Sequence, residues 1–192
     1  MNRNVILAGV GGQGLLALAG VIGEAARALG LHVRQAEVHG MAQRGGVVQS
    51  HLRYSDRPLH SNLVRMGTAQ LVLALEPMEA LRYLPYLSPI GAVVSNAEPL
   101  VNVSGYPPVR DVLGEIERHP THRLVDAAAL AKKAGAIQAA NMVMLGAGSP
   151  FLDLSEAALI EAIASFFADK APSVIDTNVQ AFRLGAAAAP PS

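Results

Sequence analysis

Hydrophobic residues are most concentrated in the first part of the chain, in the run VILAGVGGQGLLALAG. Four apolar residues, Val5 to Ala8, have the length and composition of a short buried strand. An apolar segment from Leu15 to Leu29 follows and is closed by Gly30. The residues that separate the two apolar runs include Gly9, Gly11, Gly12 and Gly14. This order predicts a strand, a tight glycine turn and a helix that is buried on most of its sides.

A second strand and an alternating segment come next. Residues 32–38 have the composition of a strand, and a loop containing several glycines separates them from residues 47–54. In this later segment Val48, Ser50, Leu52 and Tyr54 alternate with Val47, Gln49, His51 and Arg53. A period of two with polar residues on one face is typical of a half-exposed strand in an antiparallel pair.

The rest of the chain alternates between short apolar strands and helices. We expect strands at residues 70–75, 92–95, 100–103 and 123–126. We expect helices from Pro77 to near Pro85 and at residues 111–118, 127–134, 137–145, 156–168 and 174–184, with Ser155 as the N-cap of the fifth. The pattern predicts an α/β fold: an open, mostly parallel, Rossmann-like sheet with helices on both faces and an antiparallel strand element. Residues 1–187 are interpreted as a single domain and residues 188–192 as a frayed tail.

The glycine turn is the first candidate site. Gly9, Gly11 and Gly14 satisfy the pattern G-x-G-x-x-G directly after a strand and at the start of a helix. Backbone N–H groups and the helix dipole at such a position favour a phosphate or carboxylate. A dinucleotide enzyme would also place an acidic residue at the end of the second strand, where Glu37 stands. The alternative is that the glycines serve only the close packing of helix against strand.

The second candidate site is the loop HGMAQRGG, which begins at His39. Its Arg44 is a planar cation suited to phosphate or carboxylate, although it could also brace the loop by pairing with Glu37 or Glu76. Ligands of open α/β sheets lie beyond the carboxyl ends of the strands, so we expect Gly11–Gly14 and His39–Gly46 to lie close together. The spacing of Glu37, His39 and His51 is common by chance, and no metal site is assigned to it.

Composition narrows the classes of function. The 192 residues carry no net charge and no Trp, so we expect neither nucleic-acid binding nor a base-stacking surface. Cys is absent, which excludes disulfides and Cys-ligated clusters. The start MNRNVILAG has no signal-peptide pattern, and Glu24 and Arg27 interrupt the longest apolar run, so we expect a cytoplasmic chain without a membrane span. A hydrophobic content of 51% fits either a buried partner surface or an Ala-rich core.

Several catalytic motifs are missing from the sequence. It contains neither a G-x-S-x-G elbow, a phosphate-binding G-x-x-x-x-G-K-[ST] loop nor an H-E-x-x-H pair. The Gly-Asp-Gly run and Asn-Asn pair usual at thiamine diphosphate sites are also absent. Asn141 and Asn178, on late helices, are interpreted as packing or capping residues. The sequence therefore favours a binding or assembly domain over a self-sufficient enzyme.

Five segments together resemble a known family: GVGGQG, EVHGMAQRGG, EPMEALRYLPYL, NMVMLGA and NVQAF. They are similar to the γ-type component of 2-oxoacid:ferredoxin oxidoreductases and, more narrowly, to the small subunit of the indolepyruvate-type enzymes. The glycine turn is shared by γ-type components, and the HGMAQRGG loop is the more specific mark. The segment Gly148–Pro150 departs from the regular helix end expected there.

The resemblance implies a role in oxidative decarboxylation of a 2-oxoacid, an aryl pyruvate or another, to an acyl-CoA. It places thiamine diphosphate and iron–sulfur clusters on a larger partner subunit, with ferredoxin bound through the complex, and leaves a homodimer of the isolated chain open. It assigns no catalytic residue to this chain. It implies coenzyme A contacts from Gly9, Gly11, Gly12, Gln13, Gly14, His39, Gly40, Arg44, Gly45 and Gly46. A stand-alone NAD- or FAD-dependent enzyme using Glu37, and an assembly scaffold, are the alternatives.

Overall fold

A six-stranded sheet forms the centre of the computed structural model, which describes residues 1–39, 45–101 and 105–188. The strand order is β2-β3-β1-β4-β5-β6. In the described residues, β3 runs antiparallel to β1 and β2, whereas β1, β4, β5 and β6 are parallel. The strands are β1 (Asn2–Val10), β2 (His32–His39), β3 (Val47–Ser55), β4 (Ala69–Ala74), β5 (Leu87–Asn96) and β6 (His122–Val125). The predicted α/β class with its antiparallel element is confirmed.

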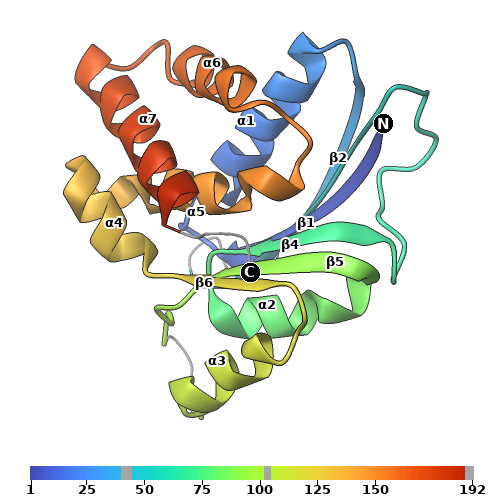
Figure 1. Ribbon diagram of the computed structural model, residues 1–192, viewed down its shortest axis with the longest axis vertical. Coiled ribbons are helices and arrows are strands. Elements are labelled where there is room, and N and C mark those ends of the chain that lie inside the picture. The colour runs from blue at the N-terminus through green and yellow to red at the C-terminus, as the bar shows by residue number, and fades with distance from the viewer. Residues whose placement is uncertain (40–44, 102–104, 189–192) are drawn as a thin grey trace.

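Helices cover both faces of this sheet (Figure 1). They are α1 (Leu15–Ala28), α2 (Pro77–Tyr83), α3 (Val109–Glu117), α4 (Ala127–Ala134), α5 (Ala140–Gly148), α6 (Glu156–Phe166) and α7 (Pro172–Ala187). Helices α1 and α4 to α7 lie on one face, and α2 and α3 lie on the other. In the described residues, no helix is both long enough and apolar enough to cross a bilayer.

The burial of α1 follows from its sequence. Its apolar residues face the sheet on one side and α6 on the other, as the all-round hydrophobic pattern predicts. Leu16 is the exception, with 63% of its surface exposed, because it stands in the first turn above the end of the sheet. Ser155 caps α6 as predicted, since its hydroxyl accepts a hydrogen bond from the N–H of Ala158 at 3.2 Å.

Three local predictions are wrong. Leu100 and Val101 belong to no strand, and the remaining residues of that predicted strand lie outside the described chain. The single helix predicted over 137–145 is divided, because a short 3-10 turn at Ile137–Ala139 precedes α5, which continues to Gly148. Strand β3 is not half exposed: His51 is only 3% exposed, because β3 lies inside the sheet and residues 56–68 cover that face.

Candidate functional site

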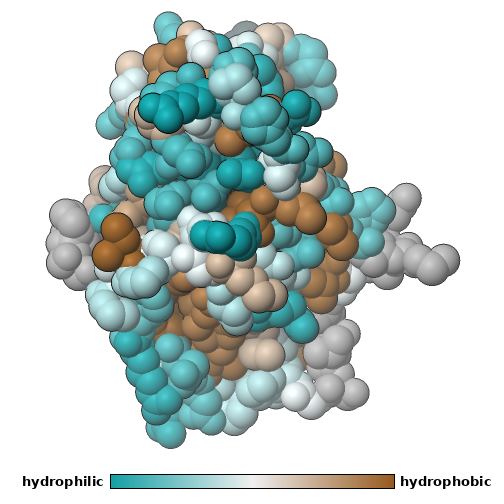
Figure 2. Space-filling view, turned by 90° about the vertical axis from the view of Figure 1, so that its right-hand side faces the viewer, coloured by the Kyte–Doolittle hydropathy of each residue, from teal (hydrophilic) through white to brown (hydrophobic). Residues whose placement is uncertain are grey.

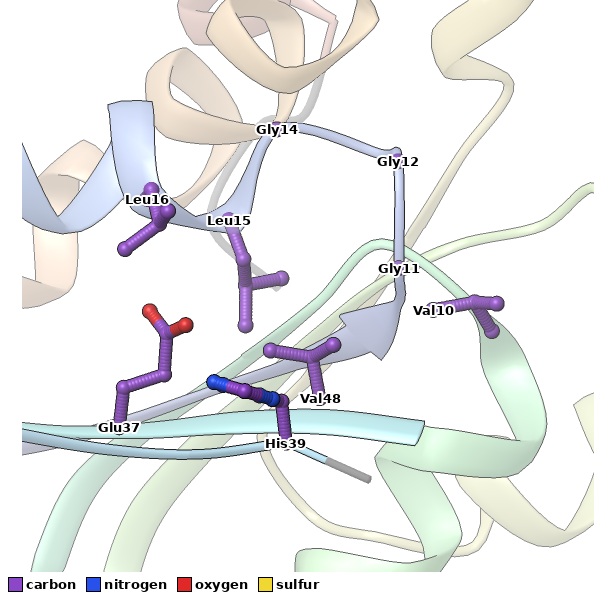
Figure 3. Close-up of a pocket in the computed structure, with 9 residues that line it drawn as sticks. All are labelled: Val10, Gly11, Gly12, Gly14, Leu15, Leu16, Glu37, His39 and Val48. Atoms are coloured by element: carbon purple, nitrogen blue, oxygen red, sulfur yellow. The ribbon is translucent and has the colours of Figure 1, made fainter. Parts of the chain in front are cut away.

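The glycine turn joins the carboxyl end of β1 to the first turn of α1, as the motif predicts (Figure 3). Gly12 and Gly14 adopt positive φ angles of 102° and 86°, a region that residues with a Cβ rarely occupy. Gly14 is the N-cap of α1 and supplies no side chain to the helix end. The first N–H groups of α1 are therefore uncapped by a side chain, which is the arrangement that favours an anion.

Gln13 braces this turn from inside. Its Oε1 accepts a hydrogen bond from the N–H of Val10 at 2.8 Å, and its Nε2 donates to the carbonyl of Leu75 at 3.1 Å. A Cβ on Gly9 would lie 2.8 Å from the same Oε1, so the packing of Gln13 needs a glycine there. Both residues were predicted as ligand contacts, and their geometry supports the packing alternative.

The two glycine-containing loops meet at this edge of the sheet. The N–H of Gly11 donates to the carbonyl of Gly46 at 2.8 Å, and the N–H of Gly45 donates to the carbonyl of Gly11 at 3.3 Å. The predicted proximity of the loops is therefore confirmed for the described residues. Gly40 and Arg44, also predicted to contact the ligand, lie outside the described part of the chain.

A pocket of about 370 Å³ opens between the first turn of α1 and β2 (Figure 3). Its walls are mostly apolar, and its polar side chains are Glu37 and His39, which rise from β2 towards α1. The Oε2 atom of Glu37 is buried without a hydrogen-bond partner among the described residues. The lining residues are Val10, Gly11, Gly12, Gly14, Leu15, Leu16, Glu37, His39 and Val48.

The carboxylate of Glu37 limits what this pocket can bind. An ionised carboxyl repels a phosphate placed next to it, whereas its buried oxygen gains a hydrogen bond from any N–H or O–H donor that enters. Chemically, the pocket suits an apolar group that carries a donor. A phosphate at the uncapped N–H groups of α1 would have to lie away from this carboxylate.

His51 does not join Glu37 and His39. It lies on the opposite face of the sheet, where its Nδ1 accepts a hydrogen bond from the N–H of Val64 at 3.1 Å and its ring packs edge-on against Tyr86. Burial lowers the pKa of His51. No group of three potential metal-ligating side chains occurs in the described residues.

Asn141 is the residue of this site that the sequence does not reveal. It is 7% exposed, and its Nδ2 donates to the carbonyl of Gly14 at 3.2 Å while its Oδ1 accepts from the N–H of Met142 at 2.9 Å. Of the two predicted roles, packing or capping, packing is confirmed: Asn141 packs against the glycine turn and does not cap α5. With Gln13 and Asn96 it also lines a second pocket of about 200 Å³ beside the turn.

Glu76, one predicted partner for Arg44, is already engaged. Its carboxylate caps α2 by accepting from the N–H of Glu79 at 3.0 Å, and it accepts from the hydroxyl of Tyr106 at 2.6 Å. Burial and the neighbouring Glu76 carboxylate raise the pKa of Tyr106, so its proton stays in this bond. Within the part of the chain that the structure describes, Glu37 is the one of these two acids that has a buried oxygen without a hydrogen-bond partner.

Comparisons with known proteins agree with this geometry. The family profile of pyruvate ferredoxin/flavodoxin oxidoreductase matches residues 4–188. The indolepyruvate oxidoreductase subunit IorB of Methanothermobacter thermautotrophicus is 41% identical over 98% of both chains. The IorB of Thermococcus kodakarensis is 38% identical over 97% of this chain and 95% of its own.

Two solved structures share the fold. A 2-oxoglutarate:ferredoxin oxidoreductase from Magnetococcus marinus, with 2-oxoglutarate, coenzyme A and succinyl-CoA bound, superposes with a TM-score of 0.78 at 24% identity. That match covers all of this chain, which spans 32% of the Magnetococcus chain. The pyruvate oxidoreductase subunit PORC of Thermotoga maritima gives 0.72 at 22% identity, covering 96% and 94% of the two chains. The chain thus belongs to the pyruvate ferredoxin/flavodoxin oxidoreductase family, and has the γ-type domain that its sequence motifs resemble.

Proposed function

We propose that this chain is the accessory subunit of a 2-oxoacid:ferredoxin oxidoreductase that acts on indolepyruvate or a related aryl pyruvate. The observation that carries the proposal is the 41% identity to an IorB subunit over nearly the full length of both chains. Subunits with a different substrate name are less similar, since KorC of 2-oxoglutarate synthase is 25% identical. The substrate assignment rests on that difference.

The chemistry of the reaction belongs to a partner subunit. Oxidative decarboxylation removes carbon dioxide and two electrons from the 2-oxoacid and transfers the acyl group to the thiol of coenzyme A. Thiamine diphosphate supplies the carbanion chemistry in such a complex, and iron–sulfur clusters pass the electrons to ferredoxin. This chain has neither a Cys with which to ligate a cluster nor the Gly-Asp-Gly and Asn-Asn motif of a thiamine diphosphate site, so we assign both groups to a larger partner subunit.

The glycine turn is proposed to face coenzyme A in the assembled enzyme. The uncapped start of α1 offers N–H donors to a phosphate, and Arg44 would add a permanent positive charge. Glu37, which is half-buried and lines the adjoining pocket, disfavours a phosphate there and would accept a hydrogen bond from an uncharged part of the ligand. The residues in this role are Gly11, Gly12, Gly14, His39, Gly40, Arg44, Gly45 and Gly46.

Arg44 provides the test of this contact. The loss of one charge-assisted hydrogen bond to phosphate costs about 1.5–3 kcal/mol, so Arg44→Ala should raise the KM for coenzyme A roughly 10- to 150-fold in the reconstituted complex. Arg44→Lys keeps the charge but not the planar fork and should recover only part of the affinity. The unfolding midpoint of the free subunit should not change. A lower midpoint with an unchanged KM would instead support a bracing role.

The accessory role itself is tested by association. The chain should co-purify from its native host with a larger, Cys-rich subunit that binds thiamine diphosphate. The competing function, a stand-alone NAD- or FAD-dependent enzyme, predicts micromolar binding of NADH by the isolated chain, measured by fluorescence. NADH binding without co-purification would overturn the proposal. If the chain associates with the larger subunit but Arg44→Ala does not change the KM for coenzyme A, the result would support a pure assembly scaffold.

A further inference from the structure

The segment that joins β3 to β4, residues 56–68, has no regular secondary structure but is held firmly in place. Arg34 donates from Nε to the carbonyl of Leu59 at 3.3 Å, and Arg53 donates from Nη1 to the carbonyl of Ser61 at 2.9 Å. The N–H of Val64 donates to the buried His51. A long connection without secondary structure is uncommon in a compact domain and usually has a function.

This segment presents apolar side chains to solvent from a fixed backbone. Leu63 is 56% exposed and Met66 is 64% exposed, while Val64 between them is buried. The N–H of Gly67, next to Met66, donates to the carbonyl of Pro85 at 3.0 Å. Because the backbone is anchored on both sides of these residues, the chain cannot easily turn them inwards. Met is among the residue types enriched at protein–protein interfaces.

The same segment is rich in positive charge. Arg57 and Arg65 are exposed, and the guanidinium groups of Arg34 and Arg53 bond to its backbone. Its one acid, Asp56, forms an ion pair with the Met1 ammonium group. None of these four arginines forms an ion pair within 4.0 Å in the described part of the chain. The formal charge of the whole sequence is zero, so this local excess is not a general property of the protein.

The surface lies at the amino ends of β1 and β4, the sheet edge opposite the glycine turn. A recess of about 600 Å³ opens there, lined by Arg53, Arg57 and His60 among others. Figure 2 looks onto this side of the molecule and shows brown apolar areas next to teal hydrophilic ones. We call the exposed residues Arg57, His60, Leu63, Arg65 and Met66 the amino-edge surface.

We propose that the amino-edge surface docks a carboxylate-rich surface of the larger partner subunit. The inference rests on the proposed function, because that function supplies the partner. A segment that exposes positive charge together with apolar side chains fits an acidic surface that also carries apolar residues, and complementary charge speeds association and selects the partner. The site is separate from the glycine turn, so this chain would contact its complex at both edges of the sheet.

The test compares charge reversal on two faces of the chain. Binding of the chain to the purified larger subunit is measured by interferometry at several chloride concentrations. Arg57→Glu with Arg65→Glu should weaken binding about tenfold or more and remove most of its salt dependence. Arg110→Glu with Lys170→Glu makes the same change of charge on α3 and before α7 and should bind like the wild type. Leu63→Ser with Met66→Ser should also weaken binding, with an unchanged salt dependence.

The outcomes separate the two proposals. If the wild type does not bind the larger subunit, the proposed function fails and this inference fails with it. If the wild type binds and both charge-reversed pairs match it, only this inference is overturned. Unfolding midpoints of all variants, which change exposed residues, should equal that of the wild type.

Discussion

Alanine substitutions at Gly12 and Gly14 can be compared to isolate the effect of one contact, that between residue 14 and Asn141. Both have positive φ, so alanine at either position costs about 1–2 kcal/mol of backbone strain. A Cβ on Gly12 would meet nothing within 4 Å, whereas a Cβ on Gly14 would lie 2.5 Å from the Nδ2 of Asn141. The displaced amide would lose its hydrogen bonds, at about 1–3 kcal/mol. We therefore expect Gly12→Ala to destabilise the chain by about 1–2 kcal/mol and Gly14→Ala by about 2–5 kcal/mol.

A double-mutant cycle tests the cause of that difference. Asn141→Ala already lacks the amide, so adding Gly14→Ala to it should cost only the backbone strain seen with Gly12→Ala. Urea denaturation of the isolated subunit, with all m-values compared, gives the four free energies. Equal destabilisation by the two single glycine variants would refute the reasoning. So would a Gly14→Ala cost that is the same with and without Asn141.

Two further predictions concern the core. A Cβ on Gly185 in α7 would overlap the carbonyl of Val143 in α5, so Gly185→Ala should lower the unfolding midpoint markedly, by an overpacking cost of about 1–3 kcal/mol measured in urea. Burial lowers the pKa of His51 in the folded state, so the unfolded chain binds more protons and stability should fall as pH drops below about 6.5. His51→Gln keeps an acceptor for Val64 and should flatten that slope, and an unchanged slope would refute the assignment.

The features of the fold that depend on local sequence patterns could be predicted from the sequence. The apolar run after the glycines marks α1 because only a helix between a sheet and a second helix is buried all round. The period-two segment marks β3 as antiparallel because alternation follows directly from strand geometry. The proximity of the two glycine loops follows from the direction of parallel strands, and the bonds between Gly11 and Gly46 agree with it.

Contacts between distant segments could not be predicted from such local patterns. Asn141 lies 127 residues from Gly14, and no spacing rule connects a helix start late in the chain with the first turn. The burial of His51 depends on residues 56–68 folding back over β3, which alternation within β3 does not report. The amino-edge surface could not be predicted from the sequence either. Its residues form no motif, and their exposure depends on how residues 56–68 are anchored to the rest of the chain.

The position of β2 shows why the glycine motif alone does not identify a dinucleotide site. In the dinucleotide fold the second strand lies beside the first, so an acid at its end reaches the ribose of a cofactor bound at the turn. Here β3 separates β1 from β2, which places Glu37 two strands away, about 5 Å further than in that arrangement. Its buried oxygen, which has no hydrogen-bond partner among the described residues, lies at the apolar pocket instead. The same glycine spacing therefore stands in a different strand arrangement, in which the acid would limit where a phosphate could lie.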